Sequence, residues 1–165
     1  MKKFILGAFL LLSTLSHGQI VDGLKLGLPS DEVICDLTTK GFKLSTSSPN
    51  TQDLLGYADG ELVNVRVKST PKSKLVYEIS LTKLRVTLAV AQEAYEVEKG
   101  WLIKLYGPTS NEKKSLLLDK IVYQSYWMGT TLSLTSSKYD VYEITITYKH
   151  PILGFIIEGN TEKGF

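Results

Sequence analysis

Histidine and cysteine carry much of the nucleophilic and metal chemistry of proteins, and this chain of 165 residues has only two histidines and one cysteine. His17 lies among the first eighteen residues, and His150 stands directly before Pro151 with no partner at a motif spacing. A Ser-His-Asp or Cys-His site would have to use His150. A zinc site would have only Cys35 and His150, fewer than the usual three or four ligands. The sequence therefore predicts a protein that is not an enzyme and holds no metal or other cofactor.

Two carboxylates, Glu78 and Glu143, occupy equivalent positions in similar segments. Residues 76–82 (VYEISLT) and 141–147 (VYEITIT) are identical at five of seven positions. These two acids are the best candidates for a catalytic pair, and the simpler interpretation is charge on a solvated sheet face. Two further matches, Tyr57 with Tyr126 and Gly41 with Gly107, occur in the same order at a spacing of about 65 residues. Three ordered matches indicate an internal duplication.

The elements that must position these residues are two helices and several strands. Asp59-Gly60 is a strong signal for a two-residue hairpin. Ser30 is the expected N-cap of a first helix, which ends near Gly41 and buries Cys35. The expected strands are residues 54–58, 61–67, 75–84, 116–127, 131–135 and 139–149.

Residues 90–105 have helical periodicity. The predicted buried stripe repeats every three or four residues and ends before Gly107-Pro108, where a helix cannot continue. Its members are Val90, Ala94, Val97, Trp101 and Leu105. We expect an α+β fold with an antiparallel sheet, both helices on one face, and two tandem helix–hairpin–strand repeats over about 24–84 and 88–149.

Strand periodicity then predicts an open sheet face. Val63 and Val65 alternate with Asn64 and Arg66, and residues that pair directly across a hairpin share a face. The open face would carry Ser and Thr with mixed charge, and Tyr57 and Tyr126 would lie on it while Trp127 turns inward. The expected binding residues on this face are Tyr57, Arg66, Glu78, Tyr126 and Glu143.

The N-terminal residues are typical of an export signal. Lys2 and Lys3 precede a nine-residue apolar run that is too short to span a bilayer, followed by a small-residue cleavage site before Gln19. These two lysines account for the whole net charge of +2, so the remaining chain is formally neutral. A neutral chain does not favour nucleic-acid binding. We expect a signal peptide over 1–18, one domain over 19–149 and a tail over 150–165, with no membrane span after signal removal.

The pattern Gly-Leu-x-Leu-Gly-Leu-Pro-Ser-x-x-Val (23–33), closed by Lys40-Gly41-Phe42 and followed by strands and a second copy, resembles the β-lactamase-inhibitor-like fold. The resemblance covers about residues 20–149 and implies a small exported protein of Gram-negative bacteria. It assigns no contact residues here.

These features leave two classes of function in view. The first is an exported, non-enzymatic module of the periplasm or cell exterior that binds an envelope or extracellular protein or peptide through the open face. The alternative is a periplasmic domain that binds a small ligand, a lipid or the cell wall.

Overall fold

A computed structural model describes residues 26–117, 120–127, 129–136, 141–150 and 152–153. The expected signal peptide (1–18) lies outside these residues, as does most of the expected tail (150–165). Within the tail, His150 is described, and its Nδ1 accepts the backbone N–H groups of Ile152 and Leu153 at 3.3 and 3.2 Å.

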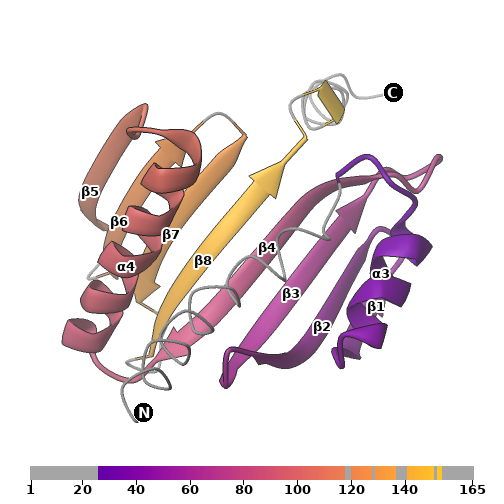
Figure 1. Ribbon diagram of the computed structural model, residues 1–165, viewed down its shortest axis with the longest axis horizontal. Coiled ribbons are helices and arrows are strands. Elements are labelled where there is room, and N and C mark those ends of the chain that lie inside the picture. The colour runs from indigo at the N-terminus through magenta and orange to yellow at the C-terminus, as the bar shows by residue number, and fades with distance from the viewer. Residues whose placement is uncertain (1–25, 118–119, 128, 137–140, 151, 154–165) are drawn as a thin grey trace, which may run out of the picture.

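The fold is α+β, as expected, with two helices and one eight-stranded antiparallel sheet among the described residues (Figure 1). The first half contains α3 (Ser30–Thr39), β1 (Lys43–Ser48), β2 (Thr51–Ala58), β3 (Glu61–Ser69) and β4 (Val76–Arg85). The second half contains α4 (Leu88–Tyr106), β5 (Asn111–Leu117), β6 (Lys120–Trp127), β7 (Thr130–Ser136) and β8 (Tyr142–Lys149). The sheet order is β1-β2-β3-β4-β8-β7-β6-β5, so each half is a meander and the two last strands meet at the centre.

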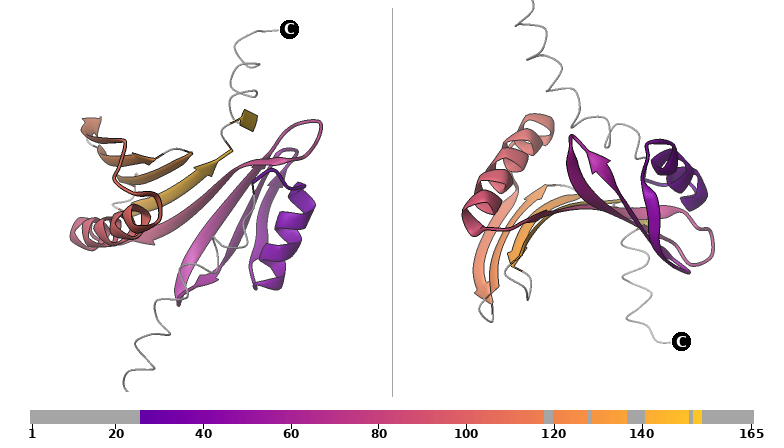
Figure 2. Two further views of the ribbon diagram at one scale, coloured as in Figure 1. Left: turned by 45° about the horizontal axis from the view of Figure 1, so that its top comes forward. Right: turned by 90° about the horizontal axis from the view of Figure 1, so that it is seen from below.

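One face of the sheet carries the apolar core. Val65 pairs with Leu81, Leu81 with Ile146, and Ile146 with Leu132, so a row of apolar side chains crosses four strands on one face. Val33 and Leu37 of α3 pack on the first half of this face, and residues of α4 pack on the second. Figure 2 shows the sheet arching, with both helices on its convex side. The opposite face is therefore concave, and neither helix of the described residues covers it.

The two halves share their order of elements. Leu81 and Ile146 are 65 residues apart in sequence and pair directly at the junction of β4 and β8. Each half contains one strand more than the expected helix–hairpin–strand unit. β1 was not predicted because all six of its residues are exposed, and they lack the apolar alternation that identifies a half-buried strand.

Two of the turns lie at the glycines where the sequence predicts them. Ala58 pairs with Glu61 across Asp59-Gly60, which gives the expected hairpin register, and Gly60 has a φ of 78°. After α3, Gly41 has a φ of 91°, while the N–H of Phe42 donates to the carbonyl of Leu37. This left-handed residue with a six-to-one hydrogen bond is the cap expected at a helix end. The helix begins at Ser30, one residue earlier than predicted, with Pro29 rather than Ser30 as N-cap.

The predicted stripe of α4 is wrong by one residue. The buried positions are Ala91, Tyr95, Glu98 and Leu102, whereas Val97 is 63% exposed. A shift of one residue rotates the buried face by about 100°. The apolar side chains on both stripes make the periodicity ambiguous, and packing on β7 and β8 selects between them. No helix in the described part of the chain is both long and apolar enough to span a bilayer.

The prediction that Cys35 is buried is also wrong, because this thiol is exposed. Val33 and Leu37 face the sheet and are fully buried. Cys35 lies two residues from each of them, which places it about 200° around the helix, on the solvent side.

Candidate functional site

The concave face contains a hollow of about 560 Å³ over the first half of the sheet and its junction with β8. Five strands supply its walls, and they combine exposed leucines with hydroxyl and charged side chains. The lining residues are Ser45, Asp53, Leu55, Leu62, Asn64, Arg66, Lys68, Glu78, Ser80, Thr82, Leu84, Glu143 and Thr145.

Strand register explains why these residues meet. Asp53 pairs with Arg66, Arg66 with Ser80, and Ser80 with Thr147, so one polar row crosses β2, β3, β4 and β8. Two residues further along each strand, Leu55, Asn64, Thr82 and Thr145 form the next row by the same pairings. Since side chains at i and i+2 share a face, both rows project to the open face, and all of their members except Thr147 line the hollow.

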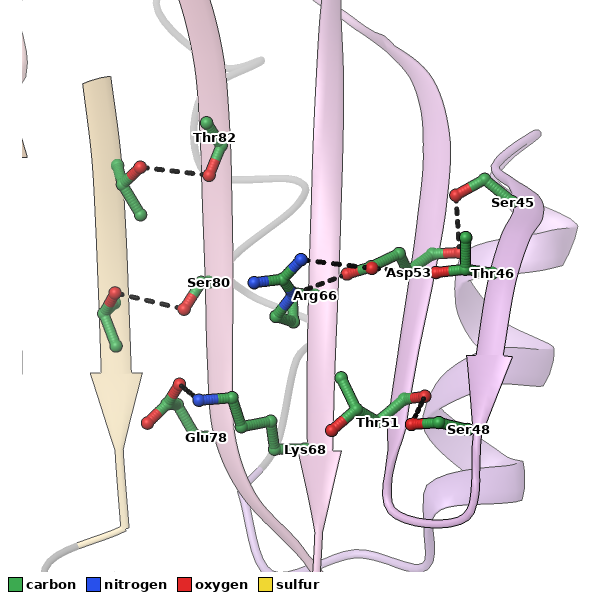
Figure 3. Close-up of polar contacts among 12 residues, drawn as sticks. Ser45, Thr46, Ser48, Thr51, Asp53, Arg66, Lys68, Glu78, Ser80 and Thr82 are labelled. Atoms are coloured by element: carbon green, nitrogen blue, oxygen red, sulfur yellow. Dashed lines mark hydrogen bonds and ion pairs between the residues drawn. The ribbon is translucent and has the colours of Figure 1, made fainter. Parts of the chain in front are cut away.

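Arg66 lines the hollow, and Asp53 holds its side chain in place (Figure 3). Its Nε donates to Asp53 Oδ1 at 2.7 Å, and its Nη2 donates to Oδ2 at 3.2 Å. The hydroxyl of Thr46 donates to Oδ2 at 2.8 Å. The hydrogen bond from Arg66 lowers the pKa of Asp53 below its usual value, and burial opposes this only in part. Asp53 is therefore the ionised anchor that orients the guanidinium.

A second charged group lies two residues further along the strands, where Lys68 pairs with Glu78. Lys68 Nζ is 2.8 Å from Glu78 Oε1, and Lys149 Nζ is 3.6 Å from Oε2. Glu78 is buried between the two ammonium groups. This arrangement neutralises a carboxylate that would otherwise be costly to bury. We call Arg66 and Lys68, which line the hollow, together with the adjacent Lys149 the cationic end of the hollow.

Hydroxyl pairs occupy the middle of the face. The hydroxyls of Ser80 and Thr147 hydrogen-bond each other at 3.1 Å, and those of Thr82 and Thr145 do so at 3.0 Å (Figure 3). Each pair joins the two halves of the sheet across β4 and β8. Because only one proton of each pair is used between the partners, these groups can still hydrogen-bond a ligand.

Exposed apolar side chains gather where β2 and β3 meet the hairpin. Tyr57 pairs with Leu62 and is 71% exposed, while Leu62 is 45% and Leu84 is 55% exposed. Leu55 lies on the same face and is also exposed. We call Leu55, Tyr57, Leu62 and Leu84 the apolar end of the hollow. Large apolar side chains grouped on an open sheet face are typical of an interaction surface.

Of the five sequence-predicted site residues, Arg66, Glu78 and Glu143 line the hollow. Tyr57 lies beside it at the apolar end. Tyr126 is on the same face but in the other half, where it pairs with Thr131 and its hydroxyl donates to Gln124 Oε1 at 2.6 Å.

Glu78 and Glu143 do not form a catalytic pair. Glu78 pairs with Lys149, whereas Glu143 pairs with Leu84, six residues further along β4. Six strand residues span about 20 Å, so the two acids lie at opposite ends of the hollow. The two acids occupy equivalent positions in similar segments of the sequence, but the antiparallel pairing of β4 with β8 places them far apart.

Sequence reasoning missed Asp53 and the three leucines of the apolar end. A signal for two of the leucines, Leu55 and Leu62, was present, because Leu54-Leu55 and Leu62-Val63 are adjacent apolar residues and strand neighbours point to opposite faces. One member of each pair had to lie on the open face. Asp53 could not be found in this way, because its role depends on the register between β2 and β3.

No protein-family model, curated protein or solved structure matches the chain. The β-lactamase-inhibitor-like resemblance therefore stays a prediction, and the argument for function depends on the residues of the hollow.

Proposed function

We propose that this protein is an exported, non-enzymatic binding module of the cell envelope, and that the concave face of its sheet binds a segment of another protein. The export signal expected at residues 1–18 supports a location in the periplasm or outside the cell. Mass spectrometry of the mature protein tests this part, and we expect its sequence to begin at Gln19. A mature chain that retained Met1 would contradict export.

The observation that carries the proposal is the apolar end of the hollow beside its cationic end. Four large apolar side chains are exposed there although the core lies on the other face of the same strands. Burying Leu and Tyr side chains against a partner releases about 1.5–3 kcal/mol each by the transfer scale. The charged and hydroxyl groups next to them supply orientation, because they hydrogen-bond only in defined directions.

The test uses the purified protein as bait in an envelope extract. Leu62→Asp and Leu84→Asp place a charge in the apolar end, and we expect both to abolish recovery of the partner. Val97→Asp is the matched control, since Val97 is equally apolar and exposed but lies on α4. Circular dichroism establishes that the three variants are folded. Equal recovery by Leu62→Asp and Val97→Asp would contradict the proposal.

One observation favours the alternative of a small ligand or cell-wall polymer. Asn64 lines the hollow, and its Oδ1 is buried without a hydrogen-bond partner among the described residues. A ligand hydroxyl could donate to this oxygen and to the neighbouring hydroxyl pairs. Binding of cell-wall fragments that is lost in Asn64→Leu but kept in Leu62→Asp would favour this alternative.

A further inference from the structure

We infer that the partner segment is extended and carries an acidic side chain for the cationic end of the hollow and apolar side chains for its apolar end. This inference rests on the proposed function and specifies its partner. It follows from which charges are exposed, how Arg66 is held and how far apart the two ends lie.

At its cationic end the hollow presents cations and shields anions, while the third lining carboxylate, Glu143, lies at the other end, paired with Leu84. The side chains of Arg66, Lys68 and Lys149 are 50, 34 and 46% exposed, whereas those of Asp53 and Glu78 are 16 and 9% exposed. Three cations therefore surround two carboxylates and lie nearer to solvent. An approaching ligand meets positive charge first, so a carboxylate is attracted and an ammonium group is repelled.

Arg66 is held ready for such a carboxylate. Asp53 engages Nε and Nη2 on one edge of the guanidinium, and Figure 3 shows the remaining nitrogen pointing away from Asp53, toward Ser80. Nη1 makes no hydrogen bond within the described residues. A carboxylate at this position would accept from Nη1 and from the hydroxyl of Ser80, which pairs directly with Arg66. Charge-assisted hydrogen bonds of this kind are about twice as strong as neutral ones.

The spacing of the two ends defines the spacing in the ligand. Arg66 and Leu62 are four residues apart on β3, which corresponds to about 13 Å. An extended peptide has the same rise, and its residues i and i+4 project on the same side. The segment that fits therefore carries Asp or Glu four residues away from Leu, Ile, Val or an aromatic residue.

The direct test is fluorescence anisotropy with labelled ten-residue peptides that are acetylated and amidated, so that they have no terminal carboxylate. The first peptide has Glu at position 3 and Leu at positions 7 and 9, among Ser and Thr. The second has Lys at position 3, and the third has Glu at position 6, which moves the acid to the other side. We expect the first to bind about tenfold more tightly than either control, which is a difference of about 1.4 kcal/mol.

Matched variants locate the acidic contact. Arg66→Ala should weaken binding of the first peptide about tenfold and should not weaken binding of the Lys peptide, because a repelling charge is removed. Lys72→Ala removes one exposed positive charge from the loop between β3 and β4, outside the hollow. It should change the affinity for neither peptide. Leu62→Ser should weaken binding of the first peptide, because it removes an apolar side chain from the apolar end. Far-ultraviolet circular dichroism verifies that each variant folds.

Three results would overturn the inference. These are equal binding of the Glu and Lys peptides, equal effects of Arg66→Ala and Lys72→Ala, or no binding of the first peptide at 1 mM. A Lys peptide that binds more tightly and depends on Leu62 would overturn the acidic partner while leaving the proposed function standing. The proposed function fails separately, if the partner from envelope extract is recovered equally by wild type and Leu62→Asp.

Discussion

The two halves of the sheet have the same order of elements and differ on the open face. The first half exposes Leu62 and Tyr57 beside Arg66. The second half presents Thr131, Ser133 and Thr135 from β7, all partly buried. Its tyrosine, Tyr126, is half-buried, with the Lys113 ammonium 5.8 Å from the ring centroid. The equivalent tyrosine of the first half is open to solvent.

This difference shows how one topology can carry two surfaces. Strand side chains alternate between faces, so the apolar residues that form the core place no constraint on the residues between them. Leu81 and Ile146 keep the two halves joined on the core side, while the open side of each half can change independently. In the function that we propose, most of the binding surface therefore belongs to the first half.

The largest loss of stability is expected at the ion pair that joins β4 of the first half to α4 of the second. Lys83 of β4 and Glu98 of α4 form a buried ion pair, with Nζ and Oε1 2.7 Å apart. Among the described residues, Glu98→Leu leaves the Lys83 ammonium with Glu61, at 3.3 Å, as its remaining carboxylate partner. The substitution should lower the free energy of unfolding by about 3 kcal/mol, because a buried ammonium loses its closer counter-charge. The double variant Lys83→Met with Glu98→Leu should be more stable than this single variant, because no buried charge is left. Urea denaturation measures both, and a double variant less stable than the single one would refute the argument.

A smaller effect is expected at Gly56 in the first half. A Cβ added there would lie 2.5 Å from Cδ1 of the buried Phe42 ring and 3.0 Å from its Cα. Gly56→Ala should therefore cost about 1–3 kcal/mol, as overpacking usually does. Thermal unfolding tests this expectation. Phe42→Leu in the same chain should recover part of the loss, and no recovery would show that the contact with the ring is not the cause.

Gly100 in the second half should respond in the opposite direction. It lies within α4, and nothing is within 4 Å of an added Cβ. Gly100→Ala should stabilise the protein by about 0.5–1 kcal/mol, because alanine loses less backbone entropy in a helix. The same thermal measurement applies. A lower melting temperature than wild type would mean that this position is constrained in a way the local space does not show.

The smallest effect is a pH dependence at the hollow. The hydrogen bond from Arg66 lowers the pKa of Asp53, so the folded protein binds the proton at this carboxylate less readily than the unfolded chain does. The stabilisation is present at neutral pH, above the unfolded pKa near 4, and is lost as the pH falls through the lower folded pKa. Wild type should therefore lose more stability than Asp53→Asn between pH 5 and pH 2. Carboxyl-carbon NMR reports the titration, and an Asp53 midpoint above 4 would contradict the assignment.

Much of the fold was predictable because it is encoded locally. The hairpin register follows from Asp59-Gly60, where a two-residue turn leaves one pairing of the flanking strands. That register places Tyr57 on the face opposite Val63. The helix end at Gly41 follows from the need for a left-handed residue after the last turn.

The tertiary structure alone decided which residues meet. α4 has apolar side chains on two adjacent stripes, and its packing on β7 and β8 buries Ala91 and Leu102 and exposes Val97. The pairing of β4 with β8 separates Glu78 from Glu143 and joins Ser80 to Thr147. Periodicity assigns a residue to a face of its own element, but the neighbour across that face comes from register between strands distant in sequence. The amino-acid pattern by itself determined the faces, and the contacts between strands built the hollow.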